Sequence, residues 1–234
     1  MRRRVLVTRP QPGAEATARA LRTAGFEPVI LSLSEIQALD VPEMDLRDFD
    51  AVAATSANAL LHAPEALLDQ VTGLPLFAVG ESTAAAASDA GFVIVLSGPG
   101  DAAGLTDAIL AQLPGGSRLL YLCGRVRRPE LEARLSAAGI ATVAVETYDT
   151  RGATDVAERL GQAAAGGPLH AVMLHSAGAA EALARLPGAA PAGALHACIS
   201  ARTAAALRGV EPHLIIVAVE PTETAMIDAL AAAA

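Results

Sequence analysis

The stretch Ala51-Val-Ala-Ala-Thr-Ser-Ala-Asn-Ala59 returns later in the chain as Ala171-Val-Met-Leu-His-Ser-Ala-Gly-Ala179. In both copies an apolar run leads into a serine and then into small residues, which is typical of a buried strand followed by a helix. At the same spacing, residues 77–86 return as residues 197–206. Such a repeat predicts a pseudo-symmetric pair of α/β units, and two units imply a cleft in which a ligand binds.

Further apolar runs alternate with helical patterns along the whole chain. Most of these runs lack alternation, so their strands should be covered on both faces, as in parallel sheets. We expect strands at residues 5–7, 28–33, 51–54, 76–79, 93–96, 119–122, 142–145, 171–174, 196–199 and 214–217. Gly25, Gly91 and Gly139 each stand between an expected helix and the next strand, where a left-handed residue commonly ends a helix. The sequence therefore predicts an α/β fold of two doubly wound parallel-sheet domains.

Two polar, extended segments follow the second strand of each repeat, at residues 32–39 and 145–151. Neither has a helix signal, and the two could pair as a two-stranded connector between the domains. The first domain would then be discontinuous. It would comprise residues 1–37 and 149–234, with residues 38–148 as the second domain. A tandem split near residue 116 is the alternative, and periodicity alone does not choose between the two.

Composition excludes several classes of protein. The net charge of −8 argues against a nucleic-acid-binding protein. All seventeen basic residues are arginines, which excludes a Walker-A loop, a pyridoxal aldimine and Schiff-base chemistry. The two cysteines and five histidines show no metal-ligand spacing. No run of about 18 apolar residues predicts a membrane span, and no signal peptide stands at the start. Cys123 and Cys198 lie in apolar runs, so we expect buried thiols and a cytoplasmic protein.

Polar residues stand at nearly every junction between a strand and the following helix. Ligands of parallel α/β sheets bind beyond these strand ends, where helix N-termini present free N–H groups. The candidate binding residues are Arg9, Ser56, Thr83, Arg128, Ser176, Thr203 and Thr222. Helix capping alone explains any single hydroxyl. The whole set, with arginines beside it, favours binding of anions, and Arg9 and Arg128 suit carboxylates because guanidinium forms paired hydrogen bonds.

Tyr148 is one of only two tyrosines and lies in a polar segment. Its phenol is either a packing group or a hydrogen-bond donor in the cleft. Tyr121 lies inside an expected strand and is interpreted as core. His175 precedes Ser176 at a strand end and could donate a proton, but no Gly-x-Ser-x-Gly context supports a hydrolase triad. No G-x-G-x-x-G opens the first helix, so neither a nicotinamide nor a flavin cofactor is expected.

Taken in order, these junctions resemble the uroporphyrinogen-III synthase family, from Val5 to about Leu230. The matching motifs are Val7-Thr8-Arg9-Pro10, Thr55 to Ala59, Val79 to Ala84, Gly124 with Arg128, Tyr148, and Pro221-Thr222. The chain departs from the family pattern Thr-Ser-Pro-Ser-Ala at His175 to Ala179. Each motif is short, and their order and spacing carry the resemblance.

The resemblance implies a cofactor-free lyase that converts hydroxymethylbilane into uroporphyrinogen III, with loss of water and inversion of ring D. This reaction belongs to the biosynthesis of haem, sirohaem and cobalamin. The resemblance also implies the discontinuous first domain and an active-site cleft between the two domains. Tyr148 would assist departure of the hydroxyl, while the seven candidate binding residues would hold substrate carboxylates. We expect a monomer. The alternatives are a non-catalytic ligand-binding or regulatory module of the same fold, and an unrelated α/β enzyme acting on a small polar substrate.

Overall fold

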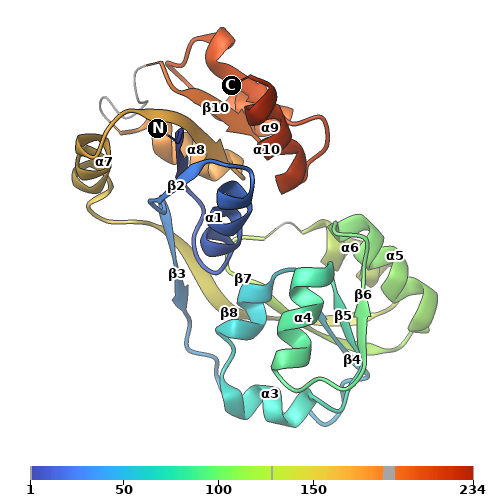
Figure 1. Cartoon of the computed structure of the whole chain (residues 1–234). Helices are drawn as coiled ribbons and strands as arrows, with labels where there is room; N and C mark the ends of the chain where they lie inside the picture. The colour runs from blue at the N-terminus through green and yellow to red at the C-terminus, as the bar shows by residue number, and fades with distance from the viewer. Residues whose placement is uncertain (1, 128, 187–192, 234) are drawn as a thin grey trace. The chain divides into compact units, whose positions relative to one another are not determined.

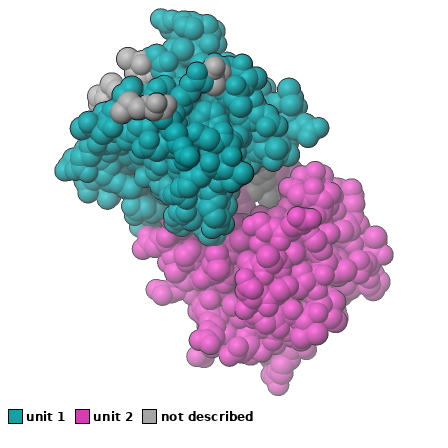
Figure 2. Space-filling model, in the orientation of Figure 1, with its two compact units in different colours: residues 1–35, 151–234 teal, residues 36–150 magenta. Residues whose placement is uncertain are grey.

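The chain forms two compact units, residues 1–35 with 151–234 and residues 36–150 (Figures 1 and 2). The computed structural model describes residues 2–127, 129–186 and 193–233. The chain leaves the first unit within strand β3 (Ser34–Ala38) and returns to it within strand β8 (Ala141–Gly152), and these two strands are hydrogen-bonded neighbours. The Leu39 amide donates to the Thr147 carbonyl at 2.9 Å, and the Ala153 amide donates to the Leu33 carbonyl at 3.1 Å. The extended segments predicted to pair as a connector therefore do so.

The first unit is a parallel sheet in the order β11-β10-β9-β1-β2, with helices on both faces. Its elements are β1 (Arg4–Val7), α1 (Gly13–Thr23), β2 (Glu27–Ile30), α7 (Val156–Ala165), β9 (Leu169–Leu174), α8 (Ala177–Ala184), β10 (Leu195–Cys198), α9 (Ala201–Ala206), the 3-10 helix η1 (Pro212–Leu214), β11 (Ile215–Val217) and α10 (Glu223–Ala232). Val5 and Val7 pack in the core with α1 and α10, whereas Leu6 packs in the opposite core with α7 and α8.

The second unit has the sheet order β3-β8-β7-β4-β5-β6. Its remaining elements are β4 (Ala51–Ala54), α2 (Ala57–Leu61), α3 (Glu65–Val71), β5 (Leu76–Ala78), α4 (Glu81–Asp89), β6 (Val95–Ser97), α5 (Ala102–Gln112), β7 (Arg118–Gly124) and α6 (Glu130–Ala137). Val52 and Ala54 pack with α2, α3 and α4, while Ala51 and Ala53 pack with α5 and α6. Successive residues of β4 thus enter opposite cores, which explains why the strand sequence shows no polar alternation.

The predicted fold class is confirmed, since every expected strand is present in a doubly wound parallel sheet. Gly25, Gly91 and Gly139 have φ values of 88°, 95° and 78°, as expected for residues that end helices. Two expected strands extend two or three residues beyond the observed ones. β2 ends at Ile30 and not at residue 33, and β6 begins at Val95 and not at Val93, which is 84% exposed. Cys123 and Cys198 are free and buried, and burial raises the pKa of each thiol to about 11. Within residues 2–127, 129–186 and 193–233, no helix combines the length and the apolar character that a membrane span requires.

The two sheets share one topology. The order β2-β1-β9-β10-β11 in the first unit corresponds to β8-β7-β4-β5-β6 in the second, so each unit combines segments from both sequence repeats. In each sheet the chain winds outward in two directions from one central pair of strands. That pair is β1 and β9 in the first unit and β7 and β4 in the second. Such switch points, at the carboxyl ends of the strands, are where doubly wound folds bind ligands.

Candidate functional site

A cavity of about 550 Å³ opens at the switch point of the second unit. Thr55 directly follows β4, Tyr121 and Gly124 lie on the adjacent strand β7, and Tyr148 lies on β8. The start of α5 and the region around α6 complete the wall. The sequence placed these residues on separate strands, and the strand order brings them together around one space.

Tyr121 contributes a buried hydroxyl to this wall. Its side chain is 2% exposed, and its hydroxyl lies 2.9 Å from Thr55 Oγ1. Burial raises the pKa of Tyr121 to about 12, against the smaller opposing effect of the Thr55 hydrogen bond. The phenol therefore stays protonated at neutral pH. Tyr121 is core, as the sequence indicated, but its hydroxyl also belongs to the cavity, which the sequence analysis missed.

Tyr148 fits the cavity because its neighbour in the sheet is a glycine. The register of β7 and β8 places Tyr148 opposite Gly124, and the Arg125 amide donates to the Tyr148 carbonyl at 2.8 Å. A Cβ on Gly124 would lie 2.7 Å from Cζ and 2.9 Å from the hydroxyl oxygen of Tyr148, closer than side-chain atoms approach. Gly124 thus provides the room that the Tyr148 ring occupies.

We expect Gly124→Ala to move the Tyr148 ring while leaving the stability of the protein nearly unchanged, since the clash involves only the far end of a side chain. NMR signals of the Tyr148 ring should shift, and those of the buried Tyr121 ring should shift less. Gly161→Ala is the matched control, because a Cβ there meets nothing within 4 Å and the helix gains about 0.5–1 kcal/mol. Unmoved Tyr148 signals in Gly124→Ala would contradict this explanation of the glycine.

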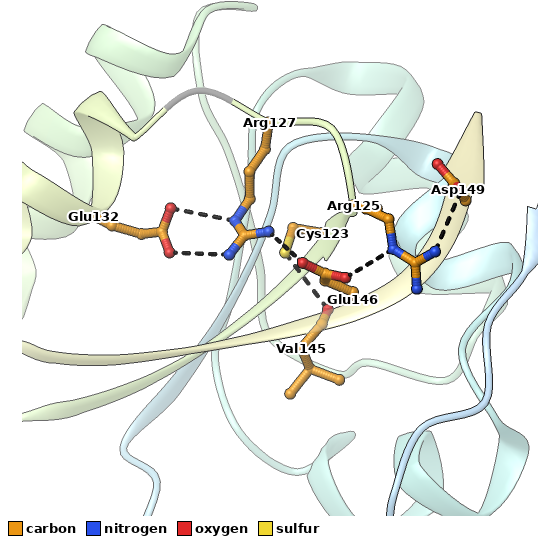
Figure 3. Close-up of polar contacts among 7 residues, drawn as sticks. All are labelled: Cys123, Arg125, Arg127, Glu132, Val145, Glu146 and Asp149. Carbon is orange, nitrogen blue, oxygen red and sulfur yellow. Dashed lines mark hydrogen bonds and ion pairs between the residues drawn. The ribbon is translucent and has the colours of Figure 1, made fainter. Parts of the chain in front are cut away.

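The arginines beside the cavity are held by the protein's own carboxylates. Arg127 donates to both oxygens of Glu132, at 3.2 and 3.4 Å, and to Glu146 at 2.8 Å (Figure 3). Burial alone would lower the pKa of Arg127, but the hydrogen bonds to Glu146 and Glu132 outweigh it and raise the pKa. The same Arg127 bond, more than the one from Arg125, lowers the pKa of Glu146. This network holds the side chains of Arg125 and Arg127 and leaves Arg127 paired.

A charged cluster lies at the switch point of the first unit. Glu223 Oε2 lies 3.3 Å from Arg9 Nη1 and 3.5 Å from His175 Nε2, and it accepts a short hydrogen bond from the Thr17 hydroxyl. Burial lowers the pKa of His175, and the contact with Glu223 opposes this only in part. Burial would raise the pKa of Glu223, but the bonds from His175 and Thr17 outweigh it and lower the pKa. His175 was considered at the sequence level; Glu223 and Thr17 were not, because their partners lie far away in the chain.

Three of the predicted binding hydroxyls cap helices. Ser56 accepts from the Asn58 amide, Ser176 from the Ala179 amide and Thr222 from the Ala225 amide. The other two, Thr83 and Thr203, are 4% and 1% exposed and lie inside the first turns of their helices. Ser56, Ser176 and Thr222 therefore have the local role that the capping alternative foresaw, whereas Thr83 and Thr203 do not cap their helices.

Of the two predicted binding arginines, the structure describes Arg9. Arg9 pairs with Glu223 through one nitrogen, and 37% of its side chain stays accessible. Gly13 provides the space for its guanidinium, since a Cβ there would lie 2.4 Å from Arg9 Nε. Arg128 lies outside the described residues. In the described parts of the chain, no three His, Cys, Asp or Glu side chains lie together as metal ligands would.

Comparison with known proteins gives one family. The family model described as uroporphyrinogen-III synthase HemD matches residues 15–228. The crystal structure of uroporphyrinogen-III synthetase from Helicobacter pylori 26695 is 18% identical, covers 100% of both chains and superposes with a TM-score of 0.70. A mutant uroporphyrinogen III synthase from the extremely thermophilic bacterium Thermus thermophilus is 20% identical, covers 99% of this chain and 98% of its own, and gives a TM-score of 0.53. At these identities the two structures show a shared fold. No curated protein matches the chain.

Proposed function

The chain belongs to the uroporphyrinogen-III synthase family, and we propose that Tyr148 is its donor to the departing hydroxyl. The family's reaction closes hydroxymethylbilane into uroporphyrinogen III, with loss of water and inversion of ring D. The observation that carries the proposal for Tyr148 is its position on the wall of the cavity at the switch point of the second unit. Thr55, Gly124 and Tyr148, which the family resemblance singled out, all line that cavity.

In this reaction the main task of the protein is to position the bilane substrate. The hydroxymethyl oxygen leaves with its bonding electrons and takes up a proton to become water, and the pyrrole nitrogen supplies the electrons that form an azafulvene. The substituted position of ring D attacks the methylene carbon of the azafulvene, from which the hydroxyl left. The resulting spiro intermediate fragments and closes again with ring D inverted. A phenol that donates a hydrogen bond to the leaving oxygen lowers the barrier of the first step. Holding the chain folded contributes the larger part.

The carboxylates of the substrate would be bound by hydroxyls and helix N-termini. We propose that the accessible hydroxyls of Ser56, Ser176 and Thr222 have this role. For Thr83 and Thr203, the backbone N–H groups of the first helical turn in which each lies would bind the carboxylate. Arg9 keeps donors besides the nitrogen that pairs with Glu223. Arg128 stays in the proposal on the family resemblance alone. As part of the same proposal, residues of both units contact one substrate molecule.

The proposal is tested by product identity. Incubation with hydroxymethylbilane generated in situ, then oxidation and chromatography, separates type I from type III uroporphyrin. Predominant type III is the expected result. Type I alone, which forms by spontaneous closure, from protein shown to be folded would overturn the proposal. We also propose that the protein is a monomer, which sedimentation would check. We propose a cytoplasmic location as well, because both cysteines are free, and cell fractionation would check it.

We expect Tyr148→Phe to lower kcat by roughly tenfold to a hundredfold and to change KM little, because one hydrogen bond to the leaving group is lost while the substrate is still folded. The product that does form should remain type III. The melting temperature serves as the control, since the ring stays in place. An unchanged kcat would remove Tyr148 from the reaction.

A further inference from the structure

The cavity of the second unit occupies the position that the charged cluster fills in the first. The sequence repeats and the common topology match the two sites residue by residue. The repeats match Thr55 with His175, Cys123 with Arg9 and Leu131 with Thr17. Ala102 matches Glu223 as the first residue of the corresponding helix. Three of the second-unit residues, Thr55, Ala102 and Leu131, line the cavity. None of these four second-unit side chains carries a charge, and Thr55, Cys123 and Ala102 are smaller than His175, Arg9 and Glu223. The second unit thus has a neutral cavity where the first has a charged cluster, which favours a ligand site over a packing fault.

The hydroxyl pair on its wall has a hydrogen to donate. Thr55 and Tyr121 have one hydroxyl hydrogen each, and the single bond between their oxygens uses one of them. Neither oxygen has another hydrogen-bond partner among the described residues. The second hydrogen is therefore available to an acceptor in the cavity. Because the Tyr121 side chain is almost fully buried, such an acceptor would be bound away from competing water.

The rest of the wall selects the chemistry of that acceptor. Val126 and Leu131 give an apolar surface suited to a ring, and Tyr148 stands on the same wall. Arg134 is paired with Asp107 at 2.6 Å, as Arg127 is paired with its glutamates, so these guanidinium groups are already engaged. The first turn of α5 also reaches the cavity, but Asp101 already caps it by accepting from the Gly104 amide, and Glu130 lies on the same wall. Donation to a carboxylate therefore comes from the hydroxyl pair. A volume of about 550 Å³ lies within the usual range of small-ligand sites, about 300–1,000 Å³.

We propose that this cavity is a subsite for one terminal pyrrole ring of the bilane, and that the Tyr121–Thr55 pair donates a hydrogen bond to a carboxylate side chain of that ring. The inference rests on the proposed function, since the role of Tyr148 at the leaving hydroxyl identifies the ring as the one that carries the hydroxymethyl group. Tyr121 and Thr55 act as positioning residues. They hold the ring so that its hydroxymethyl oxygen faces Tyr148.

The experiment uses the fact that Tyr121 and Tyr148 are the only tyrosines in the chain. With ring-labelled tyrosine, the NMR spectrum of the full chain reports on this cavity alone. Porphobilinogen, a single pyrrole with acetate and propionate side chains, is the probe. It should shift both sets of signals saturably. Tyr121→Phe and Thr55→Val should each raise its Kd roughly three- to tenfold, through loss of one hydrogen bond.

Thr142→Val is the matched control. Thr142 lies on β8 away from the cavity, and its buried Oγ1 has no hydrogen-bond partner among the described residues. The same substitution there should leave the Kd unchanged. Ala102→Glu should abolish binding yet fold normally, because the first unit carries Glu223 at the matching position and glutamate suits the first turn of a helix.

The outcomes distinguish failure of the subsite from failure of the proposed function. Wild-type protein that forms type III uroporphyrin without a saturable porphobilinogen shift overturns the subsite and leaves the proposed function standing. An equal Kd in Thr55→Val and Thr142→Val overturns the role of the hydroxyl pair. A saturable shift in a protein that forms only type I overturns the proposed function, and the cavity remains a site for a single pyrrole.

Discussion

Replacing Ser176 and Thr222 by aspartate should leave a folded protein with a much higher KM for hydroxymethylbilane. Both residues are the N-caps of their helices, and aspartate caps a helix as well as serine or threonine does. Its charge also suits the positive end of the helix, so the free energy of unfolding should not fall. A substrate carboxylate at the same position would be repelled. We expect KM to rise at least tenfold for each substitution, given about 1.5–3 kcal/mol for a charged hydrogen bond.

Asparagine at the same two positions is the matched control. It caps equally well and carries no charge, so KM should stay within about threefold of wild type while unfolding is unchanged. Steady-state kinetics and denaturant unfolding on the four single variants separate the two roles of these hydroxyls. Equal KM values for the aspartate and asparagine variants would mean that Ser176 and Thr222 cap their helices and bind no substrate.

Local features of this fold were predictable because their causes are local. The caps at Ser56, Ser176 and Thr222 depend on an amide two or three residues ahead, and glycines such as Gly139 end helices through their own backbone. The apolar runs became strands because each packs against helices on both faces of its sheet. The pairing of β3 with β8 followed from two extended segments that stood at matching places in the repeat.

The composition of the two polar centres was not predictable in the same way. Arg9 and Glu223 are 214 positions apart, and no pattern in the sequence near either residue predicts that they form an ion pair. Tyr121 looks like any core residue on a strand, because its hydroxyl acquires a role only when β4 lies beside β7 and supplies Thr55. Strand order is set by packing of the whole unit. A comparison of the repeats at Glu223 and Ala102 could have shown that the two units differ in charge at this point.

Glu223→Ala should give the largest loss of stability among the variants considered. Its carboxylate is the shared partner of Arg9, Thr17 and the buried His175, and it begins helix α10. Truncation leaves the buried Thr17 hydroxyl without its acceptor, which costs about 1–3 kcal/mol. It also removes the carboxylate that faces Arg9 and His175. We therefore expect a loss of about 3 kcal/mol in the free energy of unfolding, measured by urea denaturation at pH 7.

Glu223→Gln separates the charge from the hydrogen bonding, because the amide oxygen still accepts from the Thr17 hydroxyl and still lies beside the His175 ring. We expect it to lose about half as much stability as Glu223→Ala. Its pH dependence carries a definite sign. The pKa of Glu223 is lowered in the fold, so the contribution of its charge is fully present above the ordinary glutamate pKa and disappears as the pH falls through the folded pKa. The stability difference between wild type and Glu223→Gln should therefore shrink in acid. A difference that stays constant from pH 7 to pH 3 would show that the charge of Glu223 contributes nothing, and that the cluster is held by its neutral hydrogen bonds alone.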